Sequence, residues 1–149
     1  MSAQGRPTGL QIQRVPLDSL HTDPANARVH NDVNMAAIVG SLRRFGQAEP
    51  LVVQAGTRRI IGGNGRWVAM KQLGWTECDV VELPVENIDA TALGIALNRS
   101  GALAEWNEPE LARLLEQLRA EDSLEGVGFS DADLNALLDE LQAGNSSMP

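Results

Sequence analysis

The chain has 149 residues, of which 43% are hydrophobic, and its formal net charge is −8 at pH 7. These values predict one globular domain with a modest core. A single cysteine, Cys78, excludes an internal disulfide and favours the reducing cytoplasm. No run of 18 apolar residues is present, so the sequence does not predict a membrane span.

The charge is divided unevenly along the chain. Residues 1–75 carry nine basic and four acidic side chains, whereas residues 76–149 carry three basic and sixteen acidic ones. Eleven of the twelve bases are arginine, whose planar guanidinium suits phosphate and carboxylate groups. Two interpretations remain open. Either the two halves attract each other and stabilise the fold, or the first half holds a nucleotide or polyanion site.

Strand and helix signals alternate in the first part of the chain. In order, they predict a half-buried strand over 10–15, an amphipathic helix over 33–45 that stops at Gly46, strands over 50–53 and 58–61, a helix over 66–73 that ends at Gly74, and a strand over 78–82.

The last part of the chain is helical by its capping signals. Asp89 is the predicted cap of a helix over 90–98 that ends near Gly101. Asn107 with Glu110, and Ser130 with Asp133, have the spacing of capping boxes. A leucine stripe follows each of the last two caps, and such stripes are typical of core or helix–helix packing.

The most informative stretch is residues 59–74, where Gly62, Gly63 and Gly65 surround Asn64 and precede Arg66. Glycines allow positive φ and a close approach of a ligand to the backbone. The following helix directs its free amides and positive dipole end at the turn. Arg66 adds a fork of donors that matches phosphate oxygens. The segment is therefore a candidate anion cradle, and a simple tight turn between strand and helix is the alternative.

Two other kinds of site are disfavoured by the residues. The only histidines, His21 and His30, form no Cys/His cluster with metal spacing, which excludes a structural zinc site. Cys78 has acidic neighbours, which raise the pKa of a thiol, so we expect an inert thiol rather than a nucleophile.

Six short motifs occur in one order along the chain: Asn26/Arg28/His30, Gly46/Pro50, Gly62-Gly63-Asn64-Gly65-Arg66, Leu97-Asn98-Arg99, Trp106-Asn107 and Gly128-Phe129. In this order and spacing they resemble the ParB N-terminal domain family, which shares its fold with sulfiredoxin. The nearest likeness is to the ParB-like domains of phage proteins and DNA-modification systems. The resemblance covers about residues 10–141.

The resemblance implies a mixed α/β fold with a small mixed sheet and a C-terminal extension of two helices. Between a flexible leader (1–9) and a disordered tail (143–149), both predicted from their residues, it places a nucleotide-binding domain (10–102) followed by a helical extension (103–142).

The resemblance also implies a bound nucleotide, CTP or ATP, with Mg²⁺ as a candidate companion ion near Glu49 and Asp32. It places these residues at the nucleotide or its phosphates: Gly46, Gln47, Gly62, Gly63, Asn64, Gly65, Arg66, Asn98 and Arg99. Arg28 and His30 are additional candidate phosphate contacts.

The chain departs from the family pattern at several positions, and these departures reduce the range of activities that the resemblance implies. Partition proteins have Gly-Glu-Arg-Arg where this chain has Gly63-Asn64-Gly65-Arg66, so CTP specificity and hydrolysis are not implied. The reactive cysteine of sulfiredoxins falls at Asn64, which excludes that reductase chemistry. Residues 105–140 carry eleven acids against Arg113 and Arg119, and DNA phosphates would repel a recognition helix of that charge.

The expected function is binding of a nucleotide or nucleic-acid phosphate in a DNA-related process of phage, plasmid-partition or modification type. DNA would be contacted through the arginine-rich first half. Two alternatives stay open. One is a nucleotide hydrolase, phosphotransferase or nuclease on the same cradle, and the other is an adaptor whose acidic helices bind a protein partner.

Overall fold

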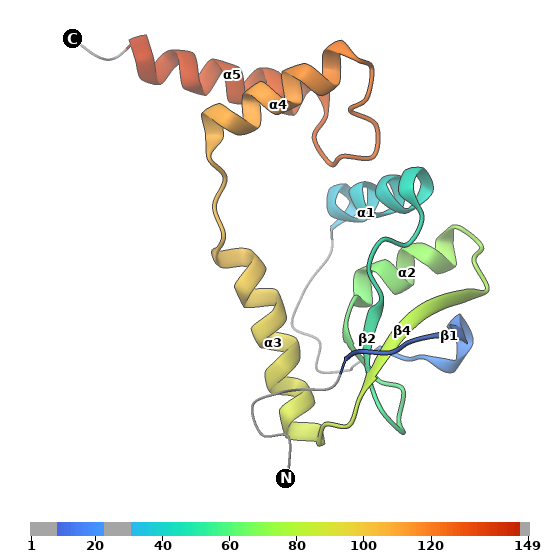
Figure 1. The fold of residues 1–149 in the computed structure, drawn as a ribbon. Coiled ribbons are helices and arrows are strands. Elements are labelled where there is room, and N and C mark those ends of the chain that lie inside the picture. Colours follow the sequence, from blue (N-terminus) through green and yellow to red (C-terminus); the bar gives the residue numbers. More distant parts are fainter. Residues whose placement is uncertain (1–8, 23–30, 147–149) are drawn as a thin grey trace.

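The structure is a computed structural model that describes residues 9–22 and 31–146 (Figure 1). Its four-stranded sheet has the order β1-β4-β2-β3. The strands are β1 (Ile12–Pro16), β2 (Leu51–Gln54), β3 (Ile60–Gly62) and β4 (Glu77–Leu83). The central strand β4 pairs antiparallel with β1 and parallel with β2, and β2 pairs antiparallel with β3. The sheet is therefore mixed, as predicted.

Two helices, α1 (Asp32–Phe45) and α2 (Asn64–Gln72), lie on one side of the sheet (Figure 1). Asn31 caps α1, since its Oδ1 accepts a hydrogen bond of 2.8 Å from the Asn34 amide. Leu42 and Met70 of these helices are buried with Val53 and Val80 of the sheet in the main core. A short 3-10 turn, η1 (Leu17–Ser19), follows β1 and adds Leu17 to the same core.

The helix α3 (Asn87–Leu103) packs against β3 on the other face of the sheet. Ile60 of β3 belongs to the main core, so its neighbour Ile61 faces the opposite way, toward α3. A Cβ on Gly94 would lie 3.3 Å from the Ile61 carbonyl oxygen. The predicted helix start was wrong, because Glu86 is the N-cap and Asp89 lies within the first turn.

After the linker 104–107, α4 (Glu108–Ala120) and α5 (Asp131–Ser146) form a helical hairpin. Both predicted N-caps are confirmed. Asn107 Oδ1 accepts from the Glu110 amide at 3.2 Å, and Ser130 Oγ accepts from the Asp133 amide at 3.1 Å. The Glu110 carboxylate forms an ion pair with Arg113 at 2.5 Å. Helix α5 continues to Ser146, so residues 143–146 are helical where a tail was predicted.

The loop between α4 and α5 docks on α1 (Figure 1). A Cβ on Gly126 would lie 2.9 Å from the Gly40 carbonyl oxygen, so the two backbones are in near contact. Arg44 donates to the Ser123 carbonyl at 2.8 Å, to Ser123 Oγ at 2.6 Å, and to the Glu125 carbonyl. Arg44, one of the arginines of the first half, therefore anchors the hairpin to α1.

Within the described ranges, no helix is both long enough and apolar enough to cross a bilayer.

Candidate functional site

The glycine turn connects β3 to α2. Gly63 is the N-cap, with φ of 102°, a left-handed conformation that favours glycine. Helix α2 therefore begins at Asn64, two residues before the predicted start at Arg66. The first helical hydrogen bond joins the Trp67 amide to the Gly63 carbonyl at 2.9 Å. The amides before Trp67 have no partner within the helix, and Gly63 supplies no side-chain cap.

Gly63 also has a packing reason to be glycine. A Cβ at this position would lie 2.5 Å from Leu51 Cδ2 and 3.3 Å from Arg66 Nη2. A neighbouring Cβ on Gly62 would lie 3.3 Å from Leu97 Cδ1 of α3. The turn is thus closely packed on both sides, and the tight-turn interpretation accounts for Gly62 and Gly63 without any ligand.

Arg66 is held at the start of α2 by the loop that follows α1. Its Nη1 donates to the Glu49 carbonyl at 3.1 Å and lies 3.8 Å from Glu49 Oε2. The Arg66 side chain is 29% exposed, so it is accessible but not freely rotating in solvent. Among the described residues, Glu49 is the partner shown for Nη1.

Gln47 positions that loop. Its Oε1 accepts from the Asp79 amide at 2.8 Å, and its Nε2 donates to the Asp79 carbonyl at 2.8 Å and the Glu49 carbonyl at 3.0 Å. The side-chain amide thus pairs with β4 as a neighbouring strand would. The side chain of Gln47 holds the loop that carries Glu49, and its predicted place near a nucleotide stays a prediction.

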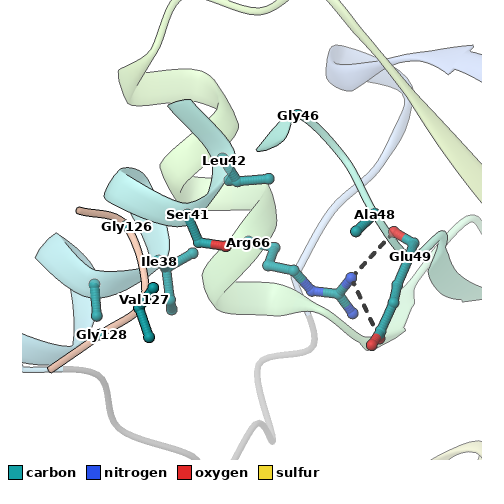
Figure 2. Close-up of a pocket in the computed structure, with 11 residues that line it drawn as sticks. Ile38, Ser41, Leu42, Gly46, Ala48, Glu49, Arg66, Gly126, Val127 and Gly128 are labelled. Carbon is teal, nitrogen blue, oxygen red and sulfur yellow. Dashed lines mark hydrogen bonds and ion pairs between the residues drawn. The ribbon is translucent and has the colours of Figure 1, made fainter. Parts of the chain in front are cut away.

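A pocket of about 370 Å³ lies between α1, this loop, Arg66 and the α4–α5 loop. Figure 2 shows Arg66 between α1 and Glu49, with the segment 126–128 running along α1. The pocket is large enough for a small ligand. It is lined by Ala37, Ile38, Ser41, Leu42, Gly46, Ala48, Glu49, Arg66, Gly126, Val127 and Gly128.

The structure brings together only some of the predicted site residues. Gly46 and Arg66 line the pocket. Asn98 and Arg99 are exposed on α3, next to Leu97, and the Asn98 side-chain Nδ2 donates to the Gly94 carbonyl at 3.1 Å. Arg28 and His30 lie outside the described residues.

The other predicted residues of the turn do not line the pocket. Gly65 is buried in α2. Asn64 Oδ1 is buried, and no hydrogen-bond partner is shown for it among the described residues. A buried acceptor without a partner is costly, so a donor from a ligand would be stabilising there.

Sequence reasoning missed the wall formed by Gly126, Val127 and Gly128. The two glycines lie between the last two helices, and their contact with α1 joins residues more than 80 positions apart. No local pattern reports such a contact. The available signal was a pair of glycines in a short loop, which also permits a close backbone approach.

Cys78 is buried in the main core, and its burial raises the pKa of the thiol to about 11, with a further rise from the Asp79 carboxylate. We predicted an acid-driven shift, whereas burial is the larger cause. Within the described part of the chain, no group of three or more His, Cys, Asp or Glu residues is arranged to hold a metal ion.

The family model described as the ParB N-terminal domain matches residues 1–101. The chain belongs to this family. The match covers the glycine turn, Arg66 and the predicted site residues Asn98 and Arg99. Among curated proteins, none matches the chain.

Solved ParB structures share the fold of this family member. Chromosome-partitioning protein ParB from Caulobacter crescentus, truncated at its C-terminus and complexed with CTP-γ-S, aligns with a TM-score of 0.65 and 18% identity, over 83% of this chain and 68% of that one. A Pnob8-like ParB-N domain aligns with a TM-score of 0.53 and 17% identity, over 94% and 64%. The Caulobacter crescentus protein complexed to the centromeric parS site aligns with a TM-score of 0.50 and 16% identity, over 85% of this chain and 64% of that one. The chain spans about two thirds of the length of these structures.

Proposed function

We propose that this ParB-like chain binds a nucleoside triphosphate, CTP or ATP, with its phosphates at the start of α2 and Arg66. The observation that carries the proposal is Arg66 itself. It lines a pocket of about 370 Å³ and stands at a helix N-terminus with no side-chain cap. The dipole of α2 and the Arg66 guanidinium both favour an anion there. The relative complexed with CTP-γ-S supports a nucleotide as that anion.

We place this activity in a DNA-related process of the partition, phage or DNA-modification type. Family membership supports that assignment, as does the relative that was solved on the parS site.

Calorimetric titration of CTP, ATP, GTP and UTP into the full chain tests the proposal. Arg66→Ala should weaken binding by roughly 1.5–3 kcal/mol, the scale of a hydrogen bond to a charged group. Arg43→Ala is the matched control, because Arg43 is an exposed arginine of α1 that does not line the pocket. That control should change the binding free energy by less than about 0.5 kcal/mol. Equal affinities of the wild type and Arg66→Ala would overturn the proposal.

Mg²⁺ fits this pocket only as a shared ion. Glu49 lines the pocket and its side chain is 77% exposed, whereas Asp32 does not line it. Mg²⁺ is commonly held by one or two carboxylates together with substrate phosphates, and Glu49 would be the carboxylate here. Repeating the titration with and without Mg²⁺ on Glu49→Gln tests this part, since the variant should lose any dependence of affinity on Mg²⁺.

A further inference from the structure

The α4–α5 hairpin carries a second hollow, distinct from the pocket at Arg66. It has a volume of about 370 Å³, and its apolar lining includes Trp106, Leu111, Phe129 and Leu137. Acidic residues at the start of α4 and along α5 complete its lining. We call this hollow the acid-rimmed groove.

Trp106 is the main apolar group offered by the groove. Its side chain is 66% exposed, and its ring meets Phe129 edge-on, with centroids 5.8 Å apart and planes at 74°. The edge-on contact with Phe129 holds one part of the indole and leaves much of its surface open. Partly buried aromatic residues in a hollow are the typical anchors of protein interfaces.

The rim is negatively charged. Glu108, Asp133 and Glu140 line the groove. Asp133 is engaged at the α5 cap, where its Oδ2 accepts from the Ser130 amide at 2.9 Å. Glu108 and Glu140 are exposed.

The surrounding hairpin does not neutralise this charge. Residues 105–140 contain eleven acids and two arginines. Arg113 pairs with Glu110 at 2.5 Å, and Arg119 donates to Asn135 Oδ1 at 2.9 Å and lies 3.9 Å from Asp131. Neither arginine lines the groove and both have other partners, so the acids of the hairpin give the groove a negative potential.

We propose that the acid-rimmed groove docks a basic amphipathic segment of another protein. An apolar side chain of that segment packs on Trp106 and Phe129, while its lysines or arginines face Glu108 and Glu140. Charge complementarity selects this occupant, because acidic partners and nucleic acids are repelled by the same carboxylates. The aromatic floor adds the apolar contact that a purely basic peptide would lack.

Fluorescence anisotropy with three labelled peptides tests the proposal on the full chain. The first peptide places leucines on one face of a helix and lysines on the other. The second has glutamate in place of each lysine, and the third has serine in place of each leucine. The leucine–lysine peptide should bind, with a dissociation constant below about 100 µM, whereas the other two should bind at least about tenfold more weakly. Failure of the leucine–lysine peptide to bind the wild type overturns the proposal.

Two double variants separate the groove from general charge. Glu108→Gln with Glu140→Gln removes the rim, and Glu116→Gln with Asp139→Asn removes two hairpin acids that do not line the groove. The rim variant should bind at least about fivefold more weakly, and the control should change by less than about twofold. Equal losses in both would show non-specific attraction and overturn the assigned site.

Trp106→Ala tests the apolar anchor and is expected to fold, because the side chain is mostly exposed. Circular dichroism checks that its helix content is unchanged. The variant should lose at least about fivefold in affinity for the leucine–lysine peptide, and unchanged affinity contradicts the proposed packing. Sedimentation of the chain without peptide gives the last arm. Self-association that Trp106→Ala abolishes would assign the groove to a second copy and overturn the proposal.

Discussion

At the scale of single residues, the backbone conformation and the packing around position 63 both require a glycine there. Its φ of 102° and the 2.5 Å approach of a Cβ to Leu51 exclude larger side chains by two independent effects. Gly74 has a φ of 81° but no atom within 4 Å of its Cβ position. The two glycines therefore separate backbone strain from steric overlap.

We expect Gly74→Ala to cost about 1 kcal/mol of unfolding free energy, from the positive φ alone. Gly63→Ala should cost about 2–5 kcal/mol, because overlap with the buried Leu51 adds to the strain. Urea unfolding of both variants measures the difference. Equal costs would mean that Leu51 moves aside and that the turn is looser than the structure shows.

Roles that depend on local sequence were predictable at this scale, and roles that depend on distant partners were not. Arg66 follows a glycine turn, so its place at a helix start could be inferred from adjacent residues. Gln47 is engaged by the backbone of Asp79, 32 positions away, so the sequence identified its loop but not its task.

At the scale of elements, the α4–α5 loop is tied to α1 through Gly126 and Arg44. Gly126 and Gly128 both have positive φ, of 79° and 99°. A Cβ on Gly126 would lie 2.9 Å from the Gly40 carbonyl oxygen, whereas one on Gly128 would only reach ordinary contact with Ala37, at 3.9 Å. Gly128→Ala is thus a matched control for Gly126→Ala.

Gly126→Ala should undock the loop, because a backbone atom of α1 cannot move aside as a flexible side chain does. The amides of residues 121–130 should then exchange with solvent at least about tenfold faster than in Gly128→Ala, as expected for a local opening that is about 1.4 kcal/mol easier. Hydrogen exchange followed by mass spectrometry measures this. Identical exchange in the two variants would contradict docking by close backbone contact.

The elements themselves were predicted to different degrees. The caps of α1, α4 and α5 and the leucine stripes are local signals, and the helices were found close to their predicted positions. The start of α3 was predicted less accurately than the starts of the other helices. Its N-cap Glu86 makes no side-chain cap hydrogen bond, and Asp89 has the residue type of a cap without being one. The docking of the hairpin had no local signal at all.

At the scale of the whole molecule, ion pairs join the basic first half of the chain to its acidic second half. Arg14 pairs with Asp79 at 3.0 Å, and Arg58 pairs with Glu82 at 2.7 Å. Arg44 holds the α4–α5 loop and Arg66 contacts Glu49. The Arg14–Asp79 and Arg58–Glu82 pairs each join the basic first half to the acidic second half, so they favour the interpretation in which the two halves attract each other.

The stability of the molecule should fall at alkaline pH because of Cys78. Burial and Asp79 raise the pKa of its thiol to about 11, whereas a thiol in the unfolded chain titrates near 8.5. Since the folded pKa is higher, the unfolded chain loses its proton first as pH rises. The contribution of the neutral thiol to the free energy of unfolding is fully present below about pH 8.5. It then declines until about pH 11, by about 2–3 kcal/mol.

Urea unfolding between pH 8 and pH 11 measures this decline, and Cys78→Ala should flatten it even though the variant is less stable overall. The chain has no tyrosine and one lysine, so few other groups titrate in the window. A decline of the same size in Cys78→Ala would assign it to Lys71 or to the amino terminus instead.

The linker 104–107 gives the docked hairpin a further property. Four residues separate the end of α3 from the start of α4. So short a tether makes docking on α1 intramolecular, at an effective concentration on the order of millimolar. A contact with an intrinsic dissociation constant of about 1 µM would then be formed in nearly every molecule, and one of about 1 mM in half of them. A short linker therefore allows contacts as few as those of Arg44 and Gly126 to hold the hairpin on α1, even where the same contacts would be too weak to join two separate chains.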